Sequence, residues 1–292
     1  MKKLYAHWCH FNNFGDALNP YLLNKLSGSK VIYCNNTLVL KNEIRYLIRD
    51  VKAGGEFDLN RLVHPFFRRN KKVILAIGSI LSDSLPNYHI WGAGFMNKNE
   101  HANGGYLYAV RGPYSAEMLY MDGFPLCEVY GDPALLLPIV FTPIKKESCD
   151  CGIIPHWKDL NYFEKKYPDK KIIDLTCGNI EEIINQITSC KYILSSSLHG
   201  IIVAHAYGIP ALWIKYGDIN TDGIKFKDYF ASVDLPIYSG ILDFDSLLSQ
   251  TYLKYPQKIK DLMFPKKSIS EIQKNLINNC PFNILPKFKL NN

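Results

Sequence analysis

The sequence lacks long apolar runs, which argues against a membrane-spanning protein. No stretch approaches the roughly 18 consecutive apolar residues that a spanning helix needs. The chain begins with lysines and a short apolar stretch, but His7, His10 and Asn12 soon interrupt it, which favours a first strand over a signal peptide. The chain also lacks low-complexity tracts and repeats of about 20 to 50 residues, so we expect no repeat architecture.

Cysteine is sparse, and the patterns that hold metals are missing. The 8 cysteines are scattered over 292 residues without the spacing of a small disulfide-rich domain. Reduced thiols in a cytoplasmic protein fit this pattern best. Cys149 and Cys151, followed by His156, have no second ligand pair at zinc-site spacing, so we expect no metal site.

The remaining composition is that of an ordinary globular protein, with 47% hydrophobic and 21% charged residues. It excludes a disordered tail, a collagen-like fibre and a coiled coil. The net charge of +7 is uneven, because residues 1–72 and 254–292 are basic and residues 73–253 are acidic. A nucleic-acid-binding protein more often carries its basic residues on the binding domain, so we expect no nucleic-acid partner.

The basic excess lies in two segments. Residues 61–72 include Arg68, Arg69, Lys71 and Lys72, and the lysine-rich tail begins at Lys254. Solvated surface is one interpretation of both segments. The other is peripheral docking at an anionic membrane surface.

Short apolar runs alternate with helical patterns along the chain. Because the apolar runs are nearly continuous, they predict an α/β protein with parallel sheets covered on both faces. We expect two Rossmann-like domains, at 1–142 and 150–265, and a basic C-terminal helical segment at 266–292. The expected strands are 3–8, 30–33, 72–77, 88–91, 107–110, 151–154, 171–174, 192–195 and 211–214. The expected helices are 17–26, 113–121, 160–166, 180–188, 200–207, 244–251, 255–262 and 268–276.

Polar residues and glycines follow the strands of the first half. A strand stops and a helix begins at Asn13, Gly15 and Asp16. These residues are interpreted either as a plain helix cap or as a turn whose N–H groups hold an anion or sugar hydroxyls. Two further strands end in glycines, at the edge where open α/β sheets bind ligands. These positions are Gly78 with Ser79, and Gly92 with Gly94. Asn97 replaces the third glycine of a dinucleotide fingerprint, which disfavours a nicotinamide site.

Two charged residues end strands of the same half. Arg111 precedes Gly112 and Pro113 at a helix start, where a guanidinium suits a carboxylate or phosphate, or pairs with an acid of its own domain. Asp132 precedes Pro133 and is suited equally to capping or to accepting a hydroxyl proton.

The strongest pattern lies at residues 192–210, where a strand runs into serines and then a helix. Ser195, Ser196 and Ser197, followed by Leu198, His199 and Gly200, indicate an anion site at a helix N-terminus, or an N-cap cluster with a core histidine. The helix dipole disfavours a cationic His199, and a bound dianion would favour it, so His199 is a candidate proton donor. His205 fits the core better, because it lies on another face of the helix. His156 and Lys225 lie at expected cleft positions, as anion contacts or as solvated surface.

In their order, these segments resemble the polysaccharide pyruvyltransferase family over residues 12–229. The resemblance implies a glycosyltransferase-B-like fold with two Rossmann-like domains facing a cleft. It also implies transfer of pyruvate from phosphoenolpyruvate onto a sugar as a ketal, without a cofactor. Some members have Arg immediately before Leu-His-Gly, where this chain has Ser197, so other cations must hold the donor.

The resemblance suggests roles for these residues. His199 is the expected general acid, and Asp16 or Asp132 the base. The expected donor contacts are Arg111, His156, Ser195, Ser196, Ser197, Leu198, Gly200 and Lys225. The expected acceptor contacts are Asn13, Gly15, Gly78, Ser79, Gly92 and Gly94.

The expected setting is capsule or cell-envelope assembly. The protein would be cytoplasmic, at the inner face of the cell membrane, with a polyprenyl-diphosphate-linked oligosaccharide as acceptor. The alternatives are a nucleotide-sugar-dependent glycosyltransferase of the same fold and a non-catalytic polysaccharide-assembly protein.

Overall fold

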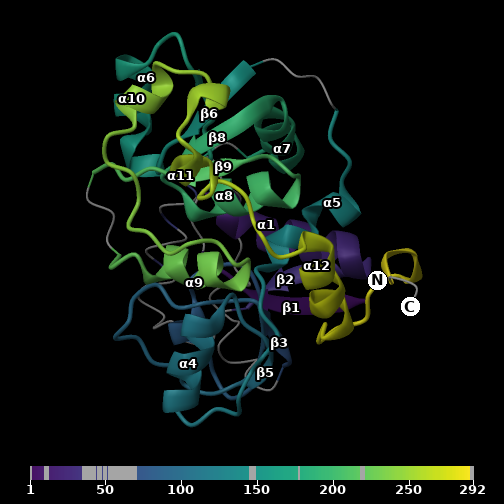
Figure 1. Cartoon of the computed structure of the whole chain (residues 1–292). Coiled ribbons are helices and arrows are strands. Elements are labelled where there is room, and N and C mark those ends of the chain that lie inside the picture. The colour runs from purple at the N-terminus through teal and green to yellow at the C-terminus, as the bar shows by residue number, and fades with distance from the viewer. Residues whose placement is uncertain are drawn as a thin grey trace.

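The computed structural model contains two parallel β-sheets (Figure 1). It describes residues 2–9, 13–34, 71–144, 149–176, 178–217 and 221–289, with the single positions 44, 48 and 51. The first sheet has the order β2-β1-β3-β4-β5 and the second β7-β6-β8-β9. The strands of the first sheet are β1 (Lys3–His7), β2 (Lys30–Tyr33), β3 (Val73–Leu75), β4 (Tyr88–Trp91) and β5 (Tyr106–Ala109). Those of the second are β6 (Cys149–Ile154), β7 (Lys171–Ile172), β8 (Cys190–Ser195) and β9 (Ala211–Trp213).

Each of the nine expected strands is present, and every pairing between them is parallel. The α/β class with parallel sheets is therefore confirmed. The division into two domains and the glycosyltransferase-B-like arrangement stay predictions.

Helices lie between the strands in sequence and pack on both sheets (Figure 1). The eight expected helices are present, and the described residues add α5 and α9, which were not predicted from the sequence. The helices are α1 (Phe14–Ser27), α4 (Pro113–Met121), α5 (Leu137–Val140), α6 (Leu160–Lys166), α7 (Ile180–Thr188), α8 (Leu198–Ala206), α9 (Ile224–Ser232), α10 (Asp245–Leu248), α11 (Gln257–Lys260) and α12 (Ile269–Asn278). Short 3-10 turns include η2 (Pro133–Leu136) and η3 (Trp157–Asp159).

Both sheets have a topological switch point, where consecutive crossovers leave in opposite directions. It lies between β1 and β3 in the first sheet and between β6 and β8 in the second. In open α/β sheets, ligands bind beyond the carboxyl ends of the strands at this point. The loops after these four strands are therefore the first places to look for a site.

One hydrophobic cluster spans both halves, and each half also has a cluster of its own. Phe14 and Leu18 of α1 belong to the same buried cluster as Ile154 of β6 and Ile201 of α8. The N–H of Phe14 also donates to the carbonyl of Leu175, from the second half (2.8 Å). The start of α1 is therefore held against the second sheet's carboxyl edge.

The C-terminal segment returns to the first sheet. α12 packs against η2 and lies close to both labelled chain ends in Figure 1. The indole Nε1 of Trp91 donates to the carbonyl of Leu276 (2.9 Å), and the N–H of Leu285 donates to the carbonyl of Leu26 (2.8 Å). Residues 266–289 thus cover the first sheet, although they follow the second in sequence.

One cysteine pair departs from the expectation of free thiols. Cys149 of β6 and Cys190 of β8 lie opposite each other and form a disulfide. The prediction of reduced thiols is therefore wrong for this pair, because parallel pairing brings together two cysteines that lie 41 residues apart in the sequence.

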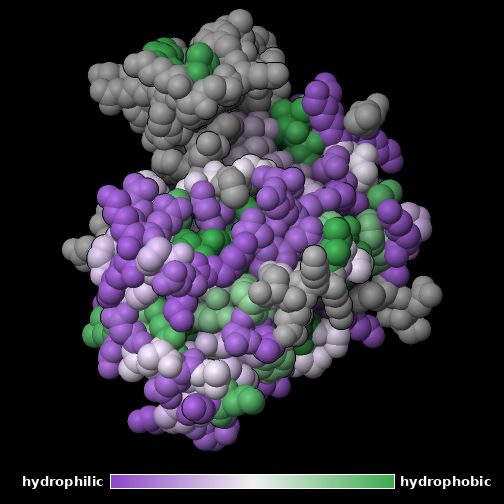
Figure 2. Space-filling model, turned by 90° about the horizontal axis from the view of Figure 1, so that it is seen from above, coloured by the Kyte–Doolittle hydropathy of each residue, from purple (hydrophilic) through white to green (hydrophobic). Residues whose placement is uncertain are grey.

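One face of the molecule is drawn in space-filling form in Figure 2. The face seen in Figure 2 is dominated by hydrophilic residues, with apolar residues in small groups. Within the described ranges, none of the helices has the length and apolar character needed to cross a membrane.

Candidate active site

A pocket of about 230 Å³ lies where the two switch points meet. Its walls come from the loops after β1, β3, β6 and β8, with further residues from α9 and neighbouring loops. The lining residues are Cys9, Asn13, Asp16, Gly78, Ser79, Ile80, Met96, Pro155, His156, Trp157, Leu175, Ser197, Leu198, His199 and Lys225. The pocket therefore lies where ligands bind in open α/β sheets, at the switch point of each of the two sheets.

His199 stands in the first turn of α8, with its ring against the start of α1. A Cβ on Gly15 would lie 2.2 Å from His199 Nδ1, so only glycine permits this approach. The side chain of His199 is 16% exposed. Burial lowers the pKa of His199 to about 3, and the charges of Lys225 and Arg111 act in the same direction. His199 is therefore neutral in the ligand-free protein.

Asp132 lies behind His199, away from the pocket wall. Its side chain is fully buried, and its Oδ2 is 3.9 Å from His199 Nε2. Its Oδ1 accepts the N–H of Ala134 (2.9 Å) and so caps η2. Burial raises the pKa of Asp132 to about 7. A sugar hydroxyl in the pocket does not reach this carboxyl, so the structure does not place Asp132 as an acceptor base.

Asp16 is the carboxyl that faces the pocket. It stands in the first turn of α1, which Asn13 caps by accepting the N–H of Gly15 (3.1 Å). Asp16 is only 9% exposed, and burial raises its pKa to about 7. A carboxyl that exchanges its proton near neutral pH is suited to act as a general base.

The N-terminus of α8 is open towards the pocket. The side chain of Ser197 makes no capping hydrogen bond, and the described part of the chain offers no acceptor to the N–H groups of Leu198, His199 and Gly200. Free N–H groups and the helix dipole together favour an anion at this point.

The other two serines hold the turn instead of facing the pocket. Ser195 is buried, and its hydroxyl donates to the carbonyl of Ser197 (2.8 Å) and accepts its N–H (3.0 Å). The hydroxyl of Ser196 accepts the N–H of His156 (2.7 Å). Gly200 lies beside Ser195, where a Cβ would come within 2.6 Å of the hydroxyl oxygen. These residues shape the helix start and are not part of the pocket lining.

Lys225 is the basic residue at the pocket. It comes from α9, and burial lowers its pKa to about 8, with the charge of Arg111 adding to the effect. Within the described residues, its ammonium has no hydrogen-bond or ion-pair partner, although it lies over the ring of Phe226. His156 stands nearby, and burial and Lys225 lower its pKa to about 4. Lys225 is thus a cation available to a ligand, and His156 is a neutral ring.

Arg111 is enclosed in the protein and does not line the pocket. Its Nε donates to Asp228 (3.0 Å), one Nη to the hydroxyl of Ser79 (2.7 Å) and the other to the carbonyl of Phe95 (2.6 Å). Asp228 belongs to α9 and Ser79 to the turn after β3, so Arg111, which follows β5, links these two elements. Arg111 therefore holds two elements of the pocket wall, Ser79 and the helix that carries Lys225.

Two predicted glycines serve packing around the pocket. A Cβ on Gly94 would lie 2.3 Å from Arg111 Cζ, and one on Gly92 would lie 2.2 Å from Pro133 Cδ. Gly92 also has a positive φ of 94°. Neither glycine lines the pocket, because both lie beneath its wall.

The structure thus brings about half of the predicted site residues to the pocket. They are Asn13, Asp16, Gly78, Ser79, His156, Ser197, Leu198, His199 and Lys225. The predicted residues outside the lining are Gly15, Gly92, Gly94, Arg111, Asp132, Ser195, Ser196 and Gly200. Cys9 also lines the pocket and was not predicted, although it follows β1, which ends at a switch point. His205 is buried against Tyr229 and the carbonyl of Met263, which confirms its interpretation as a core residue.

The arrangement combines an anion site with proton-transfer groups. Free N–H groups and one ammonium lie beside a neutral imidazole and a carboxyl that titrates near pH 7. Among the described residues, no three His, Cys, Asp or Glu side chains gather as metal ligands. The pocket therefore suits a small anionic ligand undergoing acid–base chemistry.

Comparison with known proteins gives one family. Residues 13–218 match the family described as polysaccharide pyruvyl transferase. A protein of Acanthamoeba polyphaga mimivirus named uncharacterized protein L143 is 31% identical over 217 residues, which cover 64% of this chain and 73% of that protein. No solved structure matches the chain significantly. All the residues that line the pocket lie within the matched range, except Cys9 and Lys225.

Proposed function

Because the chain belongs to the polysaccharide pyruvyl transferase family, we propose that it transfers pyruvate from phosphoenolpyruvate onto a sugar of a polysaccharide precursor. The product is a ketal, and phosphate is released. The observation that carries the proposal is the open N-terminus of α8, which lies in one pocket with Lys225 and His199.

The donor requires a site for two anionic groups. Phosphoenolpyruvate has a phosphate and a carboxylate on its enol carbon. The free N–H groups of Leu198 and His199 and the ammonium of Lys225 meet these charges. The pocket volume of about 230 Å³ suits a donor of this size better than a nucleotide sugar, which argues against the glycosyltransferase alternative.

The first half of the reaction needs an acid and a base. His199, made cationic by the bound anions, gives its proton to the methylene carbon. A C–H bond forms, and positive charge develops at C2. The first sugar hydroxyl attacks C2 and loses its proton to Asp16, which is the carboxyl at the pocket wall.

The second half closes the ketal. The C2–O bond to phosphate breaks, and the phosphate leaves with the electron pair and the proton held by Asp16. The second hydroxyl attacks C2 and returns a proton to His199, which restores the starting state. The scheme uses only side chains of this protein and needs no added cofactor.

The direct test measures ketal formation. The protein is incubated with phosphoenolpyruvate and candidate acceptor sugars, and the product is detected as a mass gain of one pyruvyl group less water. His199→Gln and Lys225→Met should each reduce phosphate release at least about 100-fold. His101→Gln, at an exposed surface pair, and Lys227→Met, on the same helix as Lys225, are the matched controls. Near-normal turnover in folded His199→Gln would falsify the assigned acid, and no turnover with any acceptor would favour a non-catalytic assembly protein.

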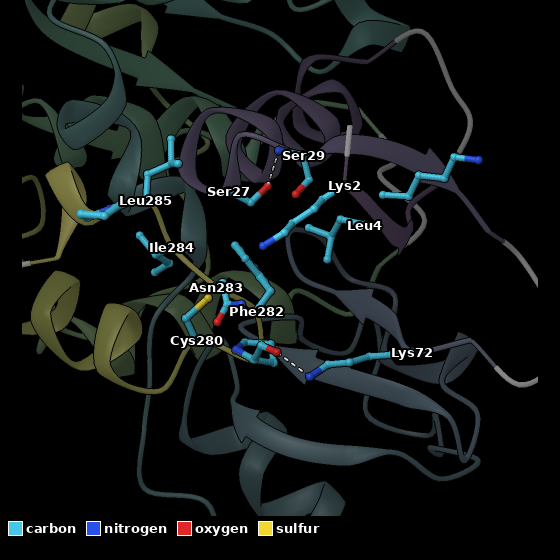
Figure 3. Close-up of a pocket in the computed structure, with 13 residues that line it drawn as sticks. Lys2, Leu4, Ser27, Ser29, Lys72, Cys280, Phe282, Asn283, Ile284 and Leu285 are labelled. Carbon is cyan, nitrogen blue, oxygen red and sulfur yellow. Dashed lines mark hydrogen bonds between the residues drawn. The ribbon is translucent and has the colours of Figure 1, made fainter.

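We further propose that the enzyme works in the cytoplasm at an anionic membrane surface, where a lipid-diphosphate-linked oligosaccharide is the acceptor. The support is a groove of about 730 Å³ at the amino ends of β1 and β3 (Figure 3). Lys2, Lys3 and Lys72 are its charged residues, and no acidic residue lines it. Its apolar lining includes Leu4, Phe282, Ile284 and Leu285.

The groove is formed where the two basic segments meet. Lys72, from the first segment, donates to the carbonyl of Pro281, in the second (Figure 3). Arg68 and Arg69, which we expected to contribute, lie outside the described residues. A basic rim over an apolar floor suits the head group and the upper chain of an anionic lipid.

Vesicle binding tests this surface. Vesicles of phosphatidylcholine with phosphatidylglycerol should bind the protein at low salt, and vesicles of phosphatidylcholine alone should not. Replacing Lys2 and Lys72 by Gln should weaken binding about 30-fold, since each cation near the surface contributes about 1 kcal/mol. Lys98→Gln with Lys191→Gln removes the same charge elsewhere and is the control. Equal binding by the two double variants, or no binding at any salt concentration, would remove the membrane from the proposal.

A further inference from the structure

Asp132 is a buried carboxyl that the proposed reaction does not use. It caps η2 through Oδ1, but Oδ2 has no hydrogen-bond partner. His199 Nε2, 3.9 Å away, is also buried and has no partner. Two buried polar atoms without partners are rare, and here they face each other. Their distance is about 1 Å longer than a hydrogen bond, so a small movement of the ring joins them.

The imidazole has two different edges. Nε2 is enclosed on the side of Asp132. Nδ1 makes no hydrogen bond and is not enclosed in this way, and it lies above the backbone of Gly15, at the end of α1 that lines the pocket. Nδ1 is therefore the nitrogen that a ligand can reach.

We propose that Asp132 is a positioning residue that acts through His199, by facing Nε2 so that Nδ1 meets the substrate and by supplying the proton that makes His199 cationic. The role in turnover rests on the proposed function. The proton sharing itself needs only an anion in the pocket.

The proton transfer is internal to the protein. Below about pH 7 the ligand-free protein holds Asp132 mostly protonated and His199 as a neutral ring. On this proposal the ring carries its proton on Nδ1, because Nε2 faces the protonated carboxyl. When an anion binds beside α8, the carboxyl O–H bond breaks and an N–H bond forms at Nε2. A carboxylate and an imidazolium result, and no proton is taken from solvent.

The surrounding charges set the direction of this transfer. Arg111 favours and Asp228 disfavours the charged form of Asp132, while Lys225 and Arg111 disfavour a cationic His199. Tyr229 also lies within range of the Asp132 charge. In the empty pocket these groups leave both partners near neutral. A bound dianion offsets the effect of Lys225 and Arg111, so the imidazolium becomes the favoured form.

The first experiment follows the His199 ring by its nitrogen-15 chemical shifts, with inorganic phosphate as the probe at pH 6, where Asp132 is mostly protonated. In the natural protein, phosphate should protonate both ring nitrogens. In Asp132→Asn the ring should stay neutral, because an amide has no proton to give and no charge to stabilise the imidazolium. The new Asn can still accept the N–H of Ala134, so the cap is retained. Asp169→Asn, at an exposed position, is the control. Equal protonation in Asp132→Asn would overturn the proposal.

A second measurement does not depend on that variant's folding. The infrared carbonyl band of a protonated carboxyl should disappear when phosphate is added to the natural protein and persist in His199→Gln. A band that does not respond to phosphate in the natural protein also overturns the proposal.

Turnover separates a positioning role from a structural one. Asp132→Asn should lower kcat about 100-fold to 10,000-fold with little change in KM for phosphoenolpyruvate, by analogy with the aspartate behind a catalytic histidine. A loss of thermal stability with a rise in KM would instead indicate a structural residue. If phosphate protonates His199 in the natural protein but no acceptor receives pyruvate, the proposed function fails and the Asp132 inference stands.

Discussion

The buried ion pair between Arg111 and Asp228 allows a quantitative stability prediction. Both side chains are 1% exposed, and Arg111 Nε is 3.0 Å from Asp228 Oδ2. Asp228→Asn keeps the shape of the side chain but removes its charge. The guanidinium then remains buried without a counter-ion, and removing one partner of such a pair costs about 3–5 kcal/mol.

The hydrogen bonds around Asp228 place the effect in the upper part of this range. Asp228 also accepts the N–H of Ser115 (2.9 Å) and its hydroxyl (2.6 Å). An Asn can accept only with its single oxygen, and its amide N–H groups would face other donors. A buried donor left without an acceptor accounts for about 1–3 kcal/mol of the cost of breaking the pair. We therefore expect Asp228→Asn to lower the free energy of unfolding by about 4–5 kcal/mol.

A double-mutant cycle distinguishes the pair from its members. Arg111→Met should also destabilise the protein strongly, because it leaves Asp228 without its cation. The double variant leaves no buried charge at this place, so it should be more stable than the sum of the two single effects predicts, by at least about 2 kcal/mol.

Urea unfolding followed by tryptophan fluorescence measures all four proteins of this cycle. The matched control is Asp245→Asn, which breaks the exposed pair with Lys166 and should cost less than about 1 kcal/mol. Strictly additive single variants would refute the reasoning, and so would an Asp228→Asn effect no larger than that of Asp245→Asn. If Asp228→Asn is too unstable to purify, Arg111→Met alone still tests the expected loss.

Three further predictions concern the pocket. Gly15→Ala should lower kcat at least about 10-fold and the midpoint of thermal unfolding by several degrees, because its methyl group would overlap the His199 ring. The profile of kcat/KM against pH should fall below about pH 7 as Asp16 gains a proton and above about pH 8 as Lys225 loses one. Lys225→Arg should shift the alkaline limb of this profile to higher pH. If the limb does not shift, the group that titrates there is Asp132 and not Lys225. The pKa of Asp132 is raised in the folded state to about 7, so the folded protein binds one more proton than the unfolded chain between about pH 4 and 7. The free energy of unfolding therefore falls as pH rises through this window. Calorimetry at pH 8 should find Asp132→Asn more stable than the natural protein by about 2–4 kcal/mol.

The sequence predicted the framework of the fold well because its signals are local. β2 and β4 begin and end at the predicted residues, since each is an apolar run with polar or glycine residues after it. α4 also has its predicted bounds, with Pro113 at the first position of the helix. α9 was missed because Lys225 and Lys227 interrupt its apolar residues, and its burial comes from contacts with distant elements such as α4 and β9.

The site was harder to predict because burial depends on distant partners. Arg111 has the motif of an anion-binding residue, but its partner Asp228 lies 117 residues away in the sequence. The three serines are adjacent and alike, and only the folded turn shows that Ser197 faces the pocket while Ser195 and Ser196 bond to backbone groups. Motif spacing therefore identified the right loops, but it did not distinguish lining residues from those that support them.

The distinction between lining and supporting residues also changes which groups bind the charges of the donor in the proposed reaction. Ser197 stands where some family members have Arg, and Arg111 was therefore expected to supply part of the missing charge. All three of its nitrogens are bound within the protein, so Arg111 acts on the donor only through Ser79 and through the position of α9. The direct contacts left are the free N–H groups of α8 and Lys225, whose pKa is lowered to about 8. A dianion that enters the pocket raises the pKa of Lys225 and of His199 together, so donor binding itself completes both the cationic site and the acid.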